Sequence, residues 1–122
     1  MKLAIPVDSK GLDAKVSANF GRANGFLFYD TKTKAESYVE NAARMARGGA
    51  GIQAAQTVVD QGAAVLLTPR LGGNAADVLD EAGVKIYRSV DGTARENVAA
   101  FEEGGLKLLD EVHEGFHGNP RP

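Results

Sequence analysis

The sequence predicts a single α/β domain built on a mixed five-stranded sheet with flanking helices. Residues 25–40 contain two strand-like runs joined by a short polar connection, which is typical of an antiparallel hairpin. Residues 63–88 alternate strand, helix and strand, which indicates a right-handed parallel crossover. A chain of 122 residues suits one compact domain. We expect this domain to span 1–110, followed by a flexible tail at 111–122.

The first half of the chain supplies three strands. Residues 2–7 form a short strand, and because Pro6 has no N–H to donate, we expect its end to lie at an edge or bulge. A long polar loop follows over 8–24. Residues 25–30 are almost continuously apolar, as in a central strand covered on both faces. Residues 35–40 alternate in part and complete the hairpin.

The second half begins with an irregular loop over 41–51 that ends in a glycine cluster. A helix over 50–61 follows, and Gly62 is its expected C-terminal cap. Residues 63–68 are apolar up to the last position, as in a buried parallel strand. The predicted inward face of the helix comprises Ile52, Ala55, Val58 and Val59.

The last elements are a turn, a helix over 75–82 and a strand over 84–88, followed by a third helix over 94–103. Thr93 is a good N-cap for the third helix, and Glu96 three residues later completes a capping-box pattern. We therefore expect the helix to begin there and to turn Val98 and Phe101 inward.

Composition excludes several classes of protein. The chain is 43% hydrophobic and 25% charged, as is usual for soluble globular proteins. It has no cysteine, which rules out disulfides and thiolate-ligated metals. A net charge of −2 argues against a general affinity for nucleic acid, and no apolar run approaches a membrane span. We expect a cytoplasmic protein.

The most informative motif is Gly48-Gly49-Ala50-Gly51, which runs straight into a helical pattern. A glycine loop that opens a helix presents unpaired backbone N–H groups at the positive end of the helix dipole, where anions bind. If that helix is antiparallel to the strand after it, the loop and Arg70 share one rim of the sheet. The sequence therefore predicts a seat for a large anion, with four arginines as candidate partners: Arg22, Arg44, Arg47 and Arg70.

Metal ligands are few. His113 and His117 are four residues apart, so a helix would place both on one face, where they could begin a metal site. Two solvated histidines would give the same pattern. Met45 offers a thioether suited to a soft metal, but a methionine covering the core would also fit.

Catalytic hypotheses have less support. Asp8, Asp13 and Asp30 could form a carboxylate cluster for a metal-dependent nuclease, although Asp8 and Asp30 precede turns, where aspartate is favoured for local hydrogen bonds alone. No serine-hydrolase motif is present. Gly72-Gly73-Asn74 resembles a phosphate loop without the Walker lysine, so a phosphate- or nucleotide-binding module is an alternative to the large-anion site.

A series of motifs in order along residues 1–110 resembles the dinitrogenase iron–molybdenum cofactor biosynthesis family. The series comprises Met1 to Asp8, Lys15-Val16-Ser17, Phe20-Gly21-Arg22-Ala23, Phe26 to Asp30, Gly49-Ala50-Gly51-Ile52-Gln53-Ala54-Ala55, Gly72-x-Asn74-Ala75, Ala82-Gly83-Val84-Lys85-Ile86-Tyr87 and Gly92-Thr93. The resemblance implies a ribonuclease H-like three-layer fold. It also implies a carrier or scaffold rather than an enzyme, with cluster donor and acceptor proteins as partners.

Members of this family bind the iron–molybdenum cofactor or its precursor, and some relatives carry a molybdenum–copper–sulfide cluster. Many have histidines before Gly-Ala-Gly, where this chain reads Asn41-Ala42-Ala43-Arg44-Met45-Ala46-Arg47-Gly48. We therefore expect charge and hydrogen bonds to sulfur, with one soft contact from Met45, to hold a preassembled cluster that is lost easily on isolation. The expected binding residues are Arg22, Arg44, Met45, Arg47, Gly48, Gly49, Ala50, Gly51 and Arg70.

Overall fold

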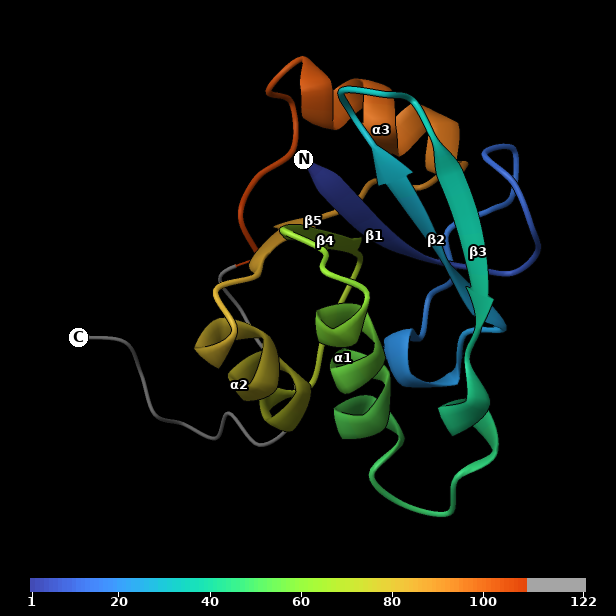
Figure 1. Cartoon of the computed structure of the whole chain (residues 1–122), viewed down its shortest axis with the longest axis vertical. Coiled ribbons are helices and arrows are strands. Elements are labelled where there is room, and N and C mark those ends of the chain that lie inside the picture. Colours follow the sequence, from blue (N-terminus) through green and yellow to red (C-terminus); the bar gives the residue numbers. More distant parts are fainter. Residues whose placement is uncertain (110–122) are drawn as a thin grey trace.

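The computed structural model describes residues 1–109, which form a five-stranded sheet with three α-helices (Figure 1). The predicted tail, with His113 and His117, lies outside the described residues. Within residues 1–109, no helix is long and apolar enough to cross a membrane. The strands are β1 (Lys2–Val7), β2 (Gly25–Asp30), β3 (Glu36–Glu40), β4 (Val65–Thr68) and β5 (Lys85–Arg88). The α-helices are α1 (Ala50–Asp60), α2 (Gly73–Glu81) and α3 (Ala94–Glu102).

The sheet is mixed, as predicted, with the order β3-β2-β1-β4-β5. β1 and β2 pair antiparallel along their whole length, and β2 pairs antiparallel with β3. β4 joins the other side of β1 in parallel, and β5 continues the parallel half. The carboxyl ends of β1, β4 and β5 therefore meet at one edge of the sheet, where ligands gather in open α/β folds.

The helices cover both faces of the sheet, which gives three layers. α1 and α2 lie side by side on one face and α3 lies on the other (Figure 1). Alternation along each strand sends successive side chains to opposite cores. In β4, Leu66 belongs to the core under α1 and α2, whereas Val65 and Leu67 belong to the core under α3.

Most element boundaries fall within a residue or two of expectation. α1 and α3 begin where predicted, and α3 has the full capping box, in which Thr93 and Glu96 exchange hydrogen bonds. α2 begins at Gly73, two residues early, because Gly72 takes the N-cap position. β4 begins at Val65, two residues later than predicted.

Two details of the predicted core are wrong. Pro6 is not at an edge of the sheet, because β1 is the central strand. The residue pairs between β1 and β4 end at Ala4, so the missing N–H of Pro6 interrupts no pair with β4. Ile52 does not face the core, because it sits in the first turn of α1, beyond the sheet, and is 43% exposed. Ala54, Ala55 and Val58 form the buried stripe of α1 instead.

Two short 3-10 helices, absent from the prediction, shape the loops beside α1. η1 (Phe20–Arg22) lies in the loop between β1 and β2, and η2 (Ala42–Met45) follows β3. Each begins with an asparagine that caps it: Asn19 accepts from the N–H of Arg22, and Asn41 accepts from the N–H of Ala43. Both pack beside the N-terminal part of α1 (Figure 1).

The outer edge of β5 is covered by the chain that follows α3. The N–H of Arg88 donates to the carbonyl of Lys107 at 2.8 Å, and the N–H of Leu109 donates to the carbonyl of Ile86 at 2.9 Å. Tyr87 and Leu108 form an antiparallel bridge between these two bonds. A short extra strand thus pairs with β5 and seals that side of the sheet.

Candidate functional site

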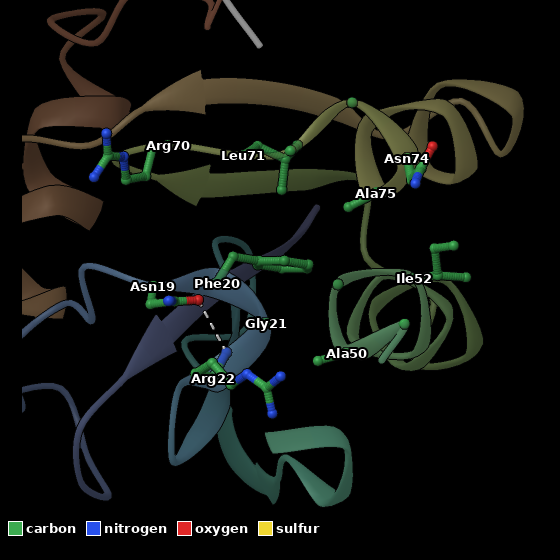
Figure 2. Close-up of a pocket in the computed structure, with 14 residues that line it drawn as sticks. Asn19, Phe20, Gly21, Arg22, Ala50, Ile52, Arg70, Leu71, Asn74 and Ala75 are labelled. Atoms are coloured by element: carbon green, nitrogen blue, oxygen red, sulfur yellow. Dashed lines mark hydrogen bonds between the residues drawn. The ribbon is translucent and has the colours of Figure 1, made fainter. Parts of the chain in front are cut away.

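A cleft of about 580 Å³ opens where α1 and α2 begin, beyond the carboxyl ends of β1 and β4 (Figure 2). Its volume is in the range of small-molecule sites. Three segments of the chain form it: η1 with Asn19, the start of α1, and the β4–α2 turn. The lining residues are Asn19, Phe20, Gly21, Arg22, Gly49, Ala50, Gly51, Ile52, Arg70, Leu71, Gly72, Gly73, Asn74 and Ala75.

Both helices begin in this cleft without a side-chain cap. Gly49 and Gly72 occupy the N-cap positions, and neither position carries a side-chain hydrogen bond within residues 1–109. The first bonds of each helix reach back to these glycines, from Gln53 in α1 and Ala76 in α2. The N–H groups ahead of those bonds have no partner within their helix, and they belong to residues that line the cleft. By contrast, α3 begins outside the cleft and is fully capped.

The glycines permit this arrangement. Gly49 has φ +72°, a left-handed conformation that residues with a side chain rarely adopt. Gly21 lies so close to α1 that a Cβ atom there would be 3.0 Å from the backbone nitrogen of Gly51. The backbone of η1 therefore packs directly against the backbone at the start of α1, and no side chain lies between Gly21 and Gly51.

The floor of the cleft is apolar. Phe20 and Leu71 are 4% and 3% exposed and belong to the core shared with α1 and α2. Phe20 packs against Phe26 of β2 with ring centroids 5.3 Å apart, which fixes η1 to the sheet. Ile52 adds a further apolar side chain at the start of α1 (Figure 2). The lining thus combines N–H groups with apolar surface.

Arg22 and Arg70 are the two charged residues of the lining, which holds no carboxylate among the residues described. The Nη1 of Arg22 donates to the carbonyl oxygens of Arg44 and Ala46, each at 2.7 Å, and its guanidinium lies on the Ala50 side of the cleft (Figure 2). The Arg70 guanidinium extends away from both helices, on the side of Asn19 (Figure 2).

The structure thus brings together only part of the predicted anion site. The glycine loop and Arg70 share one rim, as the antiparallel placement of α1 predicts. Arg44, Met45, Arg47 and Gly48 are exposed and do not line the cleft, and Met45 is 76% exposed. Arg44 and Met45 belong to η2, and the loop that follows them swings away from the sheet before it enters α1 (Figure 1).

Asn41 is a positioning residue that the sequence analysis did not single out. It is 2% exposed, and its Nδ2 donates to the carbonyls of Gly21 and Ala23, at 3.1 and 3.0 Å. Both amide atoms are satisfied, because its Oδ1 accepts from the N–H of Ala43. The residue therefore ties η2 to η1. Its partners are carbonyls about 20 positions away, so no local pattern points to them.

The nuclease hypothesis is wrong. In the β1–β2 register Lys2 faces Asp30 and Val7 faces Gly25, so Asp8 and Asp30 lie at opposite ends of the ladder. Asp13 is paired elsewhere, with the Nε of Arg95 at 2.9 Å. Within residues 1–109, no three histidine, aspartate or glutamate side chains are grouped to hold a metal ion. The histidine pair of the tail is outside this range.

Comparison with known proteins places these features in a family. The sequence model described as dinitrogenase iron–molybdenum cofactor matches residues 1–104. The apo form of the orange protein from Desulfovibrio gigas is 36% identical, with a TM-score of 0.88; the match covers 93% of this chain and 96% of that one. No curated protein sequence matches the chain.

Two further solved structures share the architecture. A Thermotoga protein described as a candidate NifB protein of the DUF35 family is 38% identical, with a TM-score of 0.81, covering 93% of this chain and 97% of its own. A candidate dinitrogenase from Methanocaldococcus jannaschii is 19% identical, with a TM-score of 0.70 over 91% and 96% of the two chains, and shares the fold alone. The predicted α/β architecture is thus found in proteins of this kind.

Proposed function

This chain belongs to the dinitrogenase iron–molybdenum cofactor family, and on that premise we propose that it is a non-catalytic carrier of an anionic, molybdenum-containing metal–sulfur cluster. The cluster is either the iron–molybdenum cofactor or a molybdenum–copper–sulfide species. It binds in the cleft at the start of α1 and α2, as cargo received from a donor protein and released to an acceptor. The likeness to the orange protein supports a role of this type.

The observation that carries this proposal is the convergence of two helix N-termini on one cleft. Among residues 1–109, neither N-terminus has a side-chain cap and no carboxylate lines the cleft. Each helix start contributes partial positive charge and free N–H groups. A bulky anion that spans the cleft meets both helix starts at once. A side-chain cap would occupy the same N–H groups, so their vacancy favours an external acceptor.

The distribution of charge in the sequence supports the same site. The chain has 16 acidic residues, yet none falls in 14–29, 41–59 or 61–76, which contain every residue that lines the cleft. The charged side chains in those three ranges are therefore all cationic, and two of them, Arg22 and Arg70, line the cleft. In an otherwise acidic protein, the segments that line the cleft therefore carry only positive side-chain charges, which attract anions over a distance set by ionic strength.

The apolar floor favours a sulfide-rich anion over a small hydrated one. Ile52, which is 43% exposed, offers no hydrogen bond at the cleft, and neither do Phe20 and Leu71 beneath it, so a strongly hydrated oxyanion would lose water there without compensation. Sulfur atoms spread charge over a larger surface and are weakly hydrated. Arginine and backbone N–H groups can donate to them at the rim while the apolar side chain of Ile52 contacts the rest.

The proposal is tested by adding tetrathiomolybdate with copper, and separately the iron–molybdenum cofactor, to metal-free protein without oxygen. We expect a coloured species that co-elutes with the protein in near-stoichiometric amount. Raising the salt concentration should weaken its binding. If neither cluster stays with the protein, the carrier function is refuted. Elemental analysis of protein purified without oxygen from its host would identify the metals of the natural cargo.

The runner-up is a phosphate- or nucleotide-binding module, because the same N–H groups of α1 and α2 would accept a phosphate. Phe20 is only 4% exposed, which leaves little aromatic surface for a base to stack on. Calorimetry with nucleotides separates the two functions. Micromolar nucleotide binding that excludes thiomolybdate would favour the module over the carrier.

A further inference from the structure

Arg22 belongs to the wall of the cleft and is also bonded to the loop that leads into α1. We define that loop, residues 44–49, as the entry loop. Arg22 donates through Nη1 to the carbonyls of Arg44 and Ala46, at 2.7 Å each. These two bonds join segments more than 20 residues apart. Within residues 1–109, no other side-chain hydrogen bond joins η1 to the entry loop.

The bonds are one half of a reciprocal lock. Asn41, at the start of η2, donates to the carbonyls of Gly21 and Ala23, on either side of Arg22. Arg22 in turn donates to carbonyls beyond the middle of η2. The Asn41 half is buried, whereas the Arg22 half is exposed and open to solvent. The Arg22 half is therefore the part that a ligand in the cleft can influence.

The geometry of a guanidinium allows both tasks at once. Arginine has five N–H donors in one plane, and the two on Nη1 are directed to the loop carbonyls. The edge formed by Nε and Nη2 keeps a parallel pair of N–H groups, the arrangement that binds an anion in bidentate fashion. An anion on that edge would fix the plane of the guanidinium and so reinforce the bonds on Nη1.

We infer that Arg22 is a positioning residue that couples occupancy of the cleft to the order of the entry loop, holding anion and loop carbonyls with different edges of one guanidinium. This inference rests on the proposed function for the identity of the anion. By linkage, a ligand that orders the loop is bound more tightly when the loop is ordered, by the same factor. Couplings of this kind are typically about 5- to 150-fold.

The rate of limited digestion with trypsin measures the order of the entry loop. Trypsin cuts the peptide bonds after Arg44 and Arg47 only when this exposed segment is mobile enough to fit the protease. We expect saturating tetrathiomolybdate with copper to slow cleavage after both arginines at least about 5-fold. Cleavage after Lys32 and Lys34, in the turn between β2 and β3, is the internal control and should keep its rate.

Three variants separate coupling from simple charge. Arg22→Gln should speed cleavage of the entry loop without ligand, at unchanged Tm. Arg22→Lys keeps the charge and can hold the carbonyls with its ammonium, but it has no second edge. It should bind the probe more weakly and, at saturating probe, lose the protection. Arg70→Gln should bind more weakly and keep full protection at saturation. The coupling is refuted if bound probe still slows cleavage of the entry loop in Arg22→Lys, or if bound probe does not slow it in wild type. Either result leaves the carrier function standing.

The ligand-free comparison keeps the two proposals distinguishable. If wild type binds no probe, the carrier function fails and the coupling to that anion fails with it. Faster loop cleavage in Arg22→Gln would even then support the positioning role of Arg22. Equal rates in wild type and Arg22→Gln would refute that role whatever the cargo is.

Discussion

Gly21 and Gly51 meet backbone to backbone across the wall of the cleft. A Cβ added to Gly21 would lie 3.0 Å from the amide nitrogen of Gly51 and 3.2 Å from its Cα. The facing atoms are backbone, so they cannot move aside as a flexible side chain would. The distance between η1 and the start of α1 therefore depends on the absence of a side chain at position 21.

Gly21→Ala should separate η1 from α1 and cost about 1–3 kcal/mol of stability, as overpacking does. We also expect weaker binding of the thiomolybdate probe, because Arg22 moves with η1. Urea unfolding and probe titration measure the two effects. Gly48→Ala is the matched control: a Cβ there meets no atom within 4 Å, so its stability should stay within about 0.5 kcal/mol of wild type. Equal midpoints for both variants would contradict the close approach.

Gly72→Asp should change stability and binding in opposite directions. An aspartate at this N-cap would accept from the first free N–H groups of α2 and stabilise the protein by a few tenths of a kcal/mol. It would also occupy the anion seat with a negative charge, so probe affinity should fall at least about 10-fold. Gly72→Ser supplies a neutral cap and should lose less affinity than Gly72→Asp. Unchanged affinity in Gly72→Asp would show that the start of α2 does not face the ligand.

Thr93→Ala removes the cap of α3, which begins outside the cleft. Its hydroxyl accepts from the N–H of Glu96 at 3.1 Å, and the Glu96 carboxylate accepts from the N–H of Thr93 at 2.9 Å. Losing this pair should cost about 1 kcal/mol. Probe affinity at a temperature well below Tm should not change. A clear loss of probe affinity in Thr93→Ala would mean that affinity depends on the stability of the fold and not on the helix starts in the cleft.

Asp30 predicts a component of acid sensitivity. Hydrogen bonds from the N–H groups of Lys32 and Thr33, and then the nearby N-terminus, lower the pKa of Asp30 below its usual 3.8. A carboxyl with a depressed pKa stabilises the fold above its unfolded pKa, and this contribution disappears as pH falls through the folded pKa. In Asp30→Asn the urea midpoint should therefore fall less between pH 5 and pH 2 than in wild type. Parallel pH profiles would refute this role of Asp30.

The sheet and its helices could be predicted because local rules act strongly there. Apolar runs such as 25–30 and 63–68 have few alternatives to a buried strand, and Thr93 with Glu96 fixes the start of α3. The predicted start of α2 is two residues late because the single N-cap glycine, Gly72, leaves no side-chain pattern, whereas the glycine cluster at 48–51 marks the start of α1. Ile52 was assigned to the core because helical spacing cannot tell where a sheet ends beneath a helix.

The site was predicted only in part, because its walls depend on contacts that are distant in sequence. The glycine loop and Arg70 follow from strand order, so they could be placed on one rim. Arg22 and Asn41 act through carbonyls of η2 and η1, and carbonyls are the same at every position of a sequence. The sequence does not distinguish Arg44 and Arg47 from Arg22 as binding residues, because only the path of η2 and the loop after it places them outside the cleft.

The pairing of residues 107–109 with β5 also bears on self-association. An open strand edge invites a second chain to add itself, and natural proteins guard against this by covering the edge or by placing charges along it. Here Leu108 and its neighbours shield β5, and Glu36 and Glu40 bracket the opposite edge at β3. Trimming the chain ahead of Lys107 would leave the N–H of Arg88 and the carbonyl of Ile86 without these partners, and the bared edge of β5 would favour strand-by-strand aggregation.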